Sequence, residues 1–261
     1  MSSRKQQREE ARAKRLAEEQ ARAEHERRRR RLRMLGGIAV GAVAVVAVLI
    51  AISSNKSTPS VPTGAAAKQT AASVEAMLSG IPQSGARLGN PNAPVTLYYY
   101  GDLQCPVCKD FSVSSLPQLI ANEVRAGKVQ VIYRSLQTAT QDPVTFATQQ
   151  VAALAAGQQQ KFWNYTELFY KQQGTEGTGY VTGTYLDGLA RQIPGLNLST
   201  WTTARSNPTL AAQVQSDQAQ SASQGFNSTP TLVFQGPKGK VQPPDAVPPY
   251  SELQAAIKQV A

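Results

Sequence analysis

Apolar and polar positions divide the chain into four parts. Residues 1–33 are charged almost throughout and show no apolar stripe, whereas residues 34–52 are apolar and carry no charge. Residues 53–84 are rich in Ser, Thr, Pro, Ala and Gly and poor in the large side chains that build a core. Only residues 85–261 combine apolar and polar positions with the spacing of buried helices and strands. The pattern predicts a charged tail, an apolar helix, a flexible stalk and one folded domain.

Within the folded domain, short β-branched and aromatic runs alternate with helical periodicity. Three strands are predicted, at 95–100, 129–134 and 231–234. The first two enclose a helix that begins at Pro106 and is kinked by Pro117. A block of helices over about 142–222 follows, and a helix over 251–260 closes the chain. This order predicts an α/β domain that is interrupted by a helical insertion.

The apolar segment 34–52 has the length of a transmembrane helix. Its 19 residues span about 28 Å as a helix, close to the roughly 30 Å of a bilayer's hydrocarbon core. A cleaved signal peptide is the alternative, but its apolar region is usually only about 7–15 residues long. Thirteen Lys and Arg residues precede the segment, and Lys56 alone follows it closely. We therefore expect a single-pass cell-membrane protein with a cytoplasmic N-terminus and an extracytoplasmic domain.

Positive charge is concentrated in the tail. The chain holds 27 Lys and Arg against 17 Asp and Glu, and the first 34 residues contribute +7 to the net charge of +10. The remaining excess of +3 gives no electrostatic reason to expect nucleic-acid binding by the folded domain. We expect the tail either to be solvated or to contact acidic lipid head groups through Arg27–Arg33.

Histidine and cysteine are scarce, which excludes several kinds of site. The only histidine, His25, lies in the tail, so the folded domain has no Ser-His-Asp or Cys-His catalytic arrangement. The only cysteines, Cys105 and Cys108, are too few ligands for a zinc site. We therefore expect neither a metal nor a bound cofactor.

The two cysteines form a Cys-Pro-Val-Cys motif at the predicted start of a helix. Free N–H groups and the positive end of the helix dipole at that position favour a thiolate at Cys105. A stabilised thiolate stabilises the dithiol and makes the corresponding disulfide a better oxidant. Cys108, one turn further, is expected to be less accessible and to resolve a mixed disulfide. A structural disulfide and half of a metal site are the alternatives, but so small a loop adds little stability and further ligands are missing.

The residues around this motif resemble a known family. Leu88–Phe111, LGNPNAPVTLYYYGDLQCPVCKDF, is similar to the active-site region of DsbA-like thiol-disulfide oxidoreductases, in their membrane-anchored, Gram-positive and actinobacterial form. The resemblance continues through Ala152–Tyr170 and Ser228–Phe234 and covers roughly residues 80–261. It implies a thioredoxin-like fold with an inserted helical domain.

The resemblance also implies a substrate site. Thr229-Pro230 matches the position of the family's cis-proline, which faces the redox cysteines, and only X-Pro bonds adopt the cis form at low cost. An ordinary trans proline at the start of a strand is the alternative. Together with Pro106 and Val107, these two residues are expected to contact an extended substrate segment, in the manner of an added strand.

Two positions depart from the family pattern. Many members carry a buried acid six residues before the first cysteine, where this chain has Tyr99. The nearest acid, Asp102, is expected to have a turn or capping role. The strongest oxidants of this kind place a histidine between the cysteines, whereas this chain has Val107, and Lys109 is the cation closest in sequence. We expect an oxidant that is weaker than those enzymes.

The sequence therefore predicts a membrane-anchored enzyme that oxidises dithiols of exported proteins to disulfides. The resemblance implies that a quinone-linked membrane partner reoxidises it. A reductase or isomerase that uses the same cysteines in the opposite direction is one alternative. A non-enzymatic, membrane-anchored binding module with the same fold is another.

Overall fold

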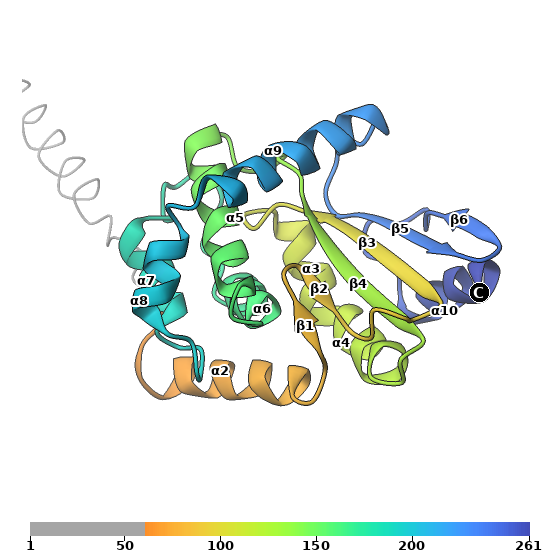
Figure 1. Cartoon of the computed structure of the whole chain (residues 1–261), viewed down its shortest axis with the longest axis horizontal. Coiled ribbons are helices and arrows are strands. Elements are labelled where there is room, and N and C mark those ends of the chain that lie inside the picture. The colour runs from red at the N-terminus through yellow and green to blue at the C-terminus, as the bar shows by residue number, and fades with distance from the viewer. Residues whose placement is uncertain (1–60) are drawn as a thin grey trace, which may run out of the picture. The chain divides into compact units, whose positions relative to one another are not determined.

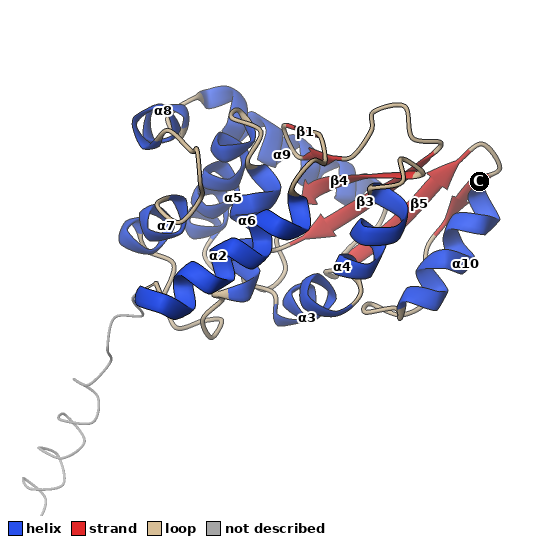
Figure 2. Ribbon diagram, turned by 90° about the horizontal axis from the view of Figure 1, so that it is seen from below, coloured by secondary structure: helices blue, strands red, loops and turns tan. Residues whose placement is uncertain are grey.

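The computed structural model describes residues 61–261, and the predicted tail and apolar segment lie outside this range. Within 61–261, no helix is both long enough and apolar enough to cross a bilayer. The described residues form a mixed β-sheet with helices packed against it and a group of helices beside it (Figures 1 and 2).

The sheet has six strands in the order β1-β2-β4-β3-β5-β6. In that order, the strands are Gln83–Ser84, Arg87–Leu88, Val129–Ser135, Val95–Gly101, Thr231–Gly236 and Gly239–Val241. β3 and β4 run parallel, whereas β5 is antiparallel to β3 and pairs Thr231 with Tyr100. β3, β4 and β5 are the three strands that the sequence predicts, and most of their side chains are buried.

The chain between β3 and β4 is helical, as predicted, but it is divided into three segments. α3 spans Pro106–Ser114, α4 spans Leu116–Leu119, and a π-helical turn spans Ile120–Val124. The first division falls at Ser115, just before the turn that contains Pro117. Proline has no N–H to donate to the preceding turn, so the helix is interrupted there.

Five helices lie between β4 and β5, where the sequence predicts a helical insertion. They are α5 (Pro143–Gly157), α6 (Phe162–Lys171), α7 (Gly183–Ala190), α8 (Leu198–Ala204) and α9 (Pro208–Ser223). The side chain of Asp142 caps α5 by accepting hydrogen bonds from the N–H groups of Val144 and Thr145. α10 (Tyr250–Val260) follows the sheet and packs against β5 and β6 (Figure 1).

Aromatic residues of α6 form much of the core of this helical group, as their helical spacing predicts. All five of them are fully buried, namely Phe162, Trp163, Tyr165, Phe169 and Tyr170. The ring of Tyr165 lies 5.9 Å from that of Trp201 in α8. The ring of Phe169 meets Tyr185 of α7 edge to face at 5.3 Å. These contacts fix α7 and α8 against α6.

The flexible stalk predicted over 53–84 is wrong for much of its length. Gly64–Leu78 form a helix, α2, which packs against α6. Val74 and Leu78 are only 1% and 3% exposed. The segment reads GAAAKQTAASVEAML, and its alanines look like a linker because they lack bulk. Alanine is also the strongest helix former, and its small side chain allows close packing, so this segment belongs to the folded domain.

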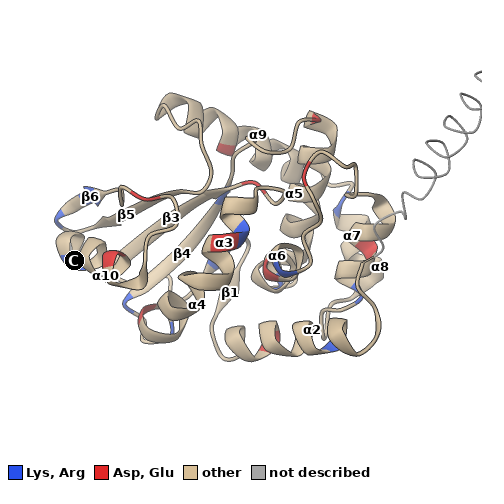
Figure 3. Ribbon diagram, turned by 180° about the vertical axis from the view of Figure 1, so that it is seen from behind, with Lys and Arg blue, Asp and Glu red and all other residues tan. Residues whose placement is uncertain are grey.

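Charged side chains are sparse over the described residues, and most of the ribbon carries neither sign (Figure 3). One ion pair connects the sheet with the helical group: Nη1 of Arg134 in β4 lies 3.0 Å from Oδ1 of Asp217 in α9. Oδ2 of Asp217 also accepts a hydrogen bond from the N–H of Ser135 over 3.0 Å. Asp217 therefore fixes α9 at the end of β4.

Candidate active site

The two cysteines lie at the start of α3, a few residues after β3 ends. Cys105 is the N-cap residue, with an extended backbone (φ −70°, ψ 121°), and Pro106 occupies the first helical position. The backbone N–H of Cys108 donates a hydrogen bond to the sulfur of Cys105 over 3.4 Å. The predicted position of the motif at a helix start is confirmed.

This geometry gives the two thiols different acidities. Cys105 is 5% exposed and Cys108 is fully buried, and neither is in a disulfide. A hydrogen bond from the thiol of Cys108 is the largest cause that lowers the pKa of Cys105, which falls to about 6. The backbone N–H groups of Cys108 and Val107 lower this pKa further, whereas burial of Cys105 opposes the shift. Burial raises the pKa of Cys108 well above its usual value, and the adjacent Cys105 raises it further. At neutral pH, Cys105 is therefore a thiolate and Cys108 a thiol.

The residues that face Cys105 come from the segment just before β5, far along the chain. The Thr229-Pro230 peptide bond is cis, as the resemblance implies. When Cys105 is protonated, its thiol donates to the carbonyl oxygen of Thr229 over 3.3 Å. The hydroxyl of Thr229 also forms a short hydrogen bond with the hydroxyl of Thr138. β5 pairs directly with β3, and this pairing brings Thr229 to the cysteines.

Asp102 has the turn role that the sequence favours, and its side chain is completely buried. Its carboxylate accepts six hydrogen bonds, from the backbone N–H groups of Gln104, Thr138, Ala139 and Thr140 and from the side chains of Thr140 and Gln149. The carboxylate thus connects the turn before Cys105 with the loop after β4. Because that loop includes Thr138, it also supports Thr229.

Tyr99, which replaces the family's acid, belongs to a group of buried phenols behind the cysteines. Its hydroxyl lies 3.4 Å from the carbonyl oxygen of Cys108 and 3.2 Å from the hydroxyl of Tyr170. The Tyr170 hydroxyl donates to the carbonyl oxygen of Asp102 over 3.4 Å. Burial raises the pKa of both tyrosines well above the usual value, so they stay neutral. They hold the backbone of the active-site turn and helix.

Glu167 is a buried acid that the sequence analysis missed. It lies on α6 with no exposed surface, and Ser112 of α3 donates a hydrogen bond to its Oε2 over 2.8 Å. Its Oε1 is buried without a hydrogen-bond partner, and burial raises its pKa to about 7. The signal in the sequence is one acidic residue within the aromatic run FWNYTELFY. Only the packing of α3 on α6 shows that this acid lies beneath the redox helix.

The remaining predicted residues lie around the sulfur of Cys105 in different ways. Pro106 is exposed and Val107 is 37% exposed, so both are accessible beside Cys105. Lys109 is not among the groups that lower the pKa of Cys105. The thiolate therefore depends on hydrogen bonds, and no neighbouring cation is needed to account for it.

Comparisons with known proteins agree with this geometry. The family model described as Thioredoxin matches residues 83–259. Disulfide bond formation protein D of Bacillus subtilis is 29% identical over 151 residues, which are 56% of this chain and 65% of that protein. This chain therefore spans slightly less than two thirds of the length of that relative.

Two solved structures show a similar arrangement of elements. Oxidised BdbD from Bacillus subtilis matches with a TM-score of 0.59 and 22% identity, over 70% of this chain and 96% of that chain. DsbA2 from Pseudomonas aeruginosa matches with a TM-score of 0.56 and 24% identity, over 70% of this chain and 97% of that chain. At these identities, the matches establish a shared fold.

Proposed function

The chain belongs to the thioredoxin family, and on that premise we propose that it is an extracytoplasmic thiol-disulfide oxidoreductase that oxidises dithiols of exported proteins. The observation that carries this proposal is the difference between its two thiols. Cys105 has a pKa of about 6, and Cys108 lies buried one turn away with a strongly raised pKa. The name of the Bacillus subtilis relative, disulfide bond formation protein D, describes the same chemistry.

The oxidation proceeds by two exchanges in which atoms and electrons balance. A substrate thiolate attacks the sulfur of Cys105 in the Cys105–Cys108 disulfide, and the bonding electron pair leaves on Cys108. Cys108 takes up a proton, because burial strongly favours its neutral thiol. A second substrate thiolate then attacks the substrate sulfur of the mixed disulfide and expels Cys105 as a thiolate. The substrate loses two electrons and gains a disulfide, and the enzyme becomes the dithiol form.

The lowered pKa of Cys105 supports the oxidising direction. A thiolate that leaves easily favours release of the oxidised substrate, and its stabilisation favours the dithiol enzyme. A reductase needs the opposite balance, in which the disulfide form of the enzyme is favoured over the dithiol form. The reduction potential in glutathione buffers separates the two directions, because a value near about −120 mV indicates an oxidase and one near about −270 mV a reductase.

Pro106, Val107, Thr229 and Pro230 are the residues proposed to contact the substrate. The first two are accessible next to Cys105, and the carbonyl oxygen of Thr229 lies 3.3 Å from the sulfur of Cys105. An extended substrate segment would hydrogen-bond with the backbone there in the manner of an added strand. The site would recognise the backbone of the substrate and its cysteine, which suits an enzyme that acts on many unfolded proteins.

We also propose where in the cell the protein acts and which kind of partner reoxidises it. The charge-free segment 34–52 would anchor the protein in the cell membrane, with the basic tail in the cytoplasm. The dithiol enzyme must pass two electrons onward before it can act again. A quinone-linked membrane protein is the proposed acceptor, and the anchor would keep the enzyme beside it.

The central test is to trap the mixed disulfide. In a Cys108→Ser variant of the full chain, the Cys105 thiolate can attack a disulfide of an exported protein, which forms a mixed disulfide and releases one substrate thiolate. Because the resolving thiol is missing, these complexes should accumulate until dithiothreitol releases them. Cys105→Ser is the matched control and should trap none. If Cys108→Ser traps no exported protein and the wild type oxidises no dithiol peptide, the proposed enzyme activity is wrong and a binding module remains.

A further inference from the structure

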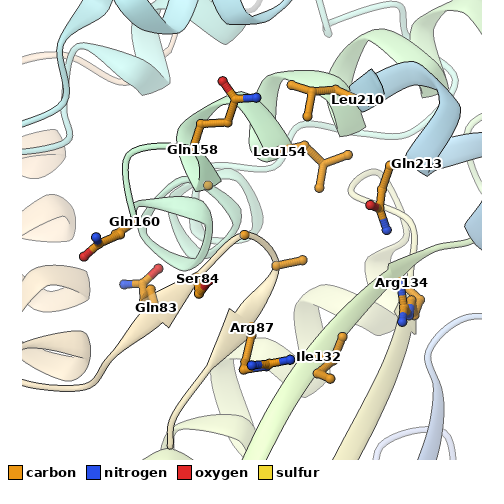
Figure 4. Close-up of a pocket in the computed structure, with 13 residues that line it drawn as sticks. Gln83, Ser84, Arg87, Ile132, Arg134, Leu154, Gln158, Gln160, Leu210 and Gln213 are labelled. Atoms are coloured by element: carbon orange, nitrogen blue, oxygen red, sulfur yellow. The ribbon is translucent and has the colours of Figure 1, made fainter. Parts of the chain in front are cut away.

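A groove of about 650 Å³ lies between the β1–β2 hairpin, β4, the end of α5 and the start of α9 (Figure 4). Leu154, Ile132 and Leu210 supply apolar surface, and Arg87 supplies positive charge. Arg134 also lines the groove but is paired with Asp217. Among the described residues that line it, none is acidic. We call it the Arg87 groove. It contains none of the residues assigned above to the redox reaction.

Each of the two arginines of this groove has one buried N–H donor without an acceptor. Nε of Arg87 and Nε of Arg134 are both buried without a hydrogen-bond partner. Arg134 is neutralised by Asp217, whereas no ion pair forms between Arg87 and an acidic residue within 61–261. Buried N–H donors without acceptors are uncommon and costly. An unneutralised guanidinium with a free donor matches a carboxylate.

The rim of the groove carries amide side chains. Gln158 and Gln160 follow the end of α5, and Gln213 projects from α9 (Figure 4). Gln160 has a left-handed backbone (φ 60°), an unusual conformation for a residue other than glycine. Amide side chains both donate and accept hydrogen bonds, as peptide groups do. Volume, charge and rim together fit a short peptide segment better than a lone anion.

From these observations we infer that the Arg87 groove binds carboxylate-bearing segments of the polypeptides that the enzyme oxidises. The inference rests on the proposed function, because it takes polypeptide dithiols as substrates. Arg134, in the groove, and Thr138, which contacts Thr229, are close along one chain. Four residues of extended chain cover at most about 14 Å. Thr229 in turn lies against the sulfur of Cys105, so a substrate bound at Cys105 would need several further residues of extended chain to reach the groove.

Two synthetic peptides test this inference without any variant. Both contain the same pair of cysteines. On each side of the cysteines the peptide continues for about six residues and ends in a run of Glu in one peptide and a run of Gln in the other. With the oxidised full-length protein, the acidic peptide should have a KM about five- to tenfold lower, and the two peptides should have equal kcat. Raising the ionic strength to about 0.5 M should reduce the difference. Equal KM values at low salt would overturn the inference.

Variants then locate the preference. Arg87→Gln should abolish it, and Arg87→Lys, which keeps the charge, should retain most of it. Arg191→Gln removes an exposed arginine from the end of α7 and is the matched control, which should behave as the wild type. A preference that survives Arg87→Gln overturns the inference and assigns peptide binding to another basic segment, such as Arg27–Arg33.

A final measurement keeps the inference separate from the proposed function. If the protein oxidises neither peptide, the proposed function fails, and binding is then measured as the rise in the melting temperature caused by the Glu peptide. A rise in the wild type that is absent in Arg87→Gln supports the groove. No rise, or the same rise in both proteins, overturns it.

Discussion

The low pKa of Cys105 depends most on the thiol of Cys108, and two substitutions of Cys108 isolate that contribution. The hydrogen bond from Cys108 is the largest cause of the lowering, ahead of the backbone N–H groups. Cys108→Ala removes the side-chain donor and leaves the backbone donors in place. Cys108→Ser replaces the thiol by a hydroxyl, which also donates. The two variants therefore differ in one hydrogen bond to the Cys105 thiolate.

The size of the effect follows from the strength of that bond. A hydrogen bond to a charged group contributes about 1.5–3 kcal/mol, and about 1.4 kcal/mol corresponds to a tenfold change in an acid dissociation constant. The pKa of Cys105 should therefore rise by about one to two in Cys108→Ala. It should remain near the wild-type value of about 6 in Cys108→Ser.

The assay follows the thiolate directly. Far-ultraviolet thiolate absorbance and the rate of alkylation by iodoacetamide are recorded against pH, and thermal unfolding checks that both variants fold. If both variants titrate at the same pH, Cys108 does not set the acidity of Cys105. If both titrate near the usual cysteine pKa of 9.0, the helix start does not stabilise the thiolate and the proposed mechanism loses its basis.

The same pKa makes the stability of the dithiol protein depend on pH. The pKa of Cys105 is lower in the folded state, about 6 against a usual 9.0. The thiolate therefore stabilises the folded dithiol protein in full only at pH values above 9.0. The stabilisation is lost as pH falls through about 6. At about pH 7.5 it amounts to at most about 2 kcal/mol, less whatever water screens at the sulfur.

Three further substitutions test the parts of the structure around the cysteines. Burial raises the pKa of Glu167 from 4.5 to about 7, so its ionisation should destabilise the fold as pH rises between these values, by up to about 3 kcal/mol. Glu167→Gln should remove that dependence in urea denaturation, and an unchanged pH profile would contradict the buried acid. Asp102→Ala leaves buried donors unpaired and should lower the free energy of unfolding by about 3–5 kcal/mol; a loss below about 1 kcal/mol would show that the carboxylate does not hold the two loops. Leu78→Ala in α2 should cost about 2–4 kcal/mol in the same measurement, with exposed Lys68→Ala as control, and equal stability of the two would restore the flexible stalk.

Local signals in the sequence were sufficient for the centre of the site. Pro106 after Cys105 marks a helix start, and the strand at 95–100 fixes which end of the sheet carries it. The position of Pro230 came from the resemblance, since nothing local indicates a cis bond. The turn role of Asp102 followed from the Gly-Asp pair. Four of the five residues that donate hydrogen bonds to it lie 36 to 47 residues away, so only the fold brings them to the carboxylate.

The missed features depend on contacts between distant segments. Glu167 looks like an exposed residue of an amphipathic helix until α3 packs over it and Ser112 meets its carboxylate. α2 looks like a linker because alanines dominate it and only Val74 and Leu78 among its buried residues are large. Lys109 follows Cys108 directly in the sequence but is not among the groups that lower the pKa of Cys105. In each case, the outcome depends on whether a side chain is buried or on which groups it faces. The sequence of a single segment does not encode either of these.

The short separation of Cys105 and Cys108 also bears on damage by peroxides. A thiolate such as Cys105 is the form of cysteine that peroxides convert to sulfenic acid, and further oxidation to sulfinic acid is irreversible. A second thiol one turn away condenses with the sulfenic acid, releases water and gives the disulfide. Oxidant stress would then return this protein to the disulfide form, which is the form that oxidises substrates, and the sulfur of Cys105 would escape irreversible oxidation.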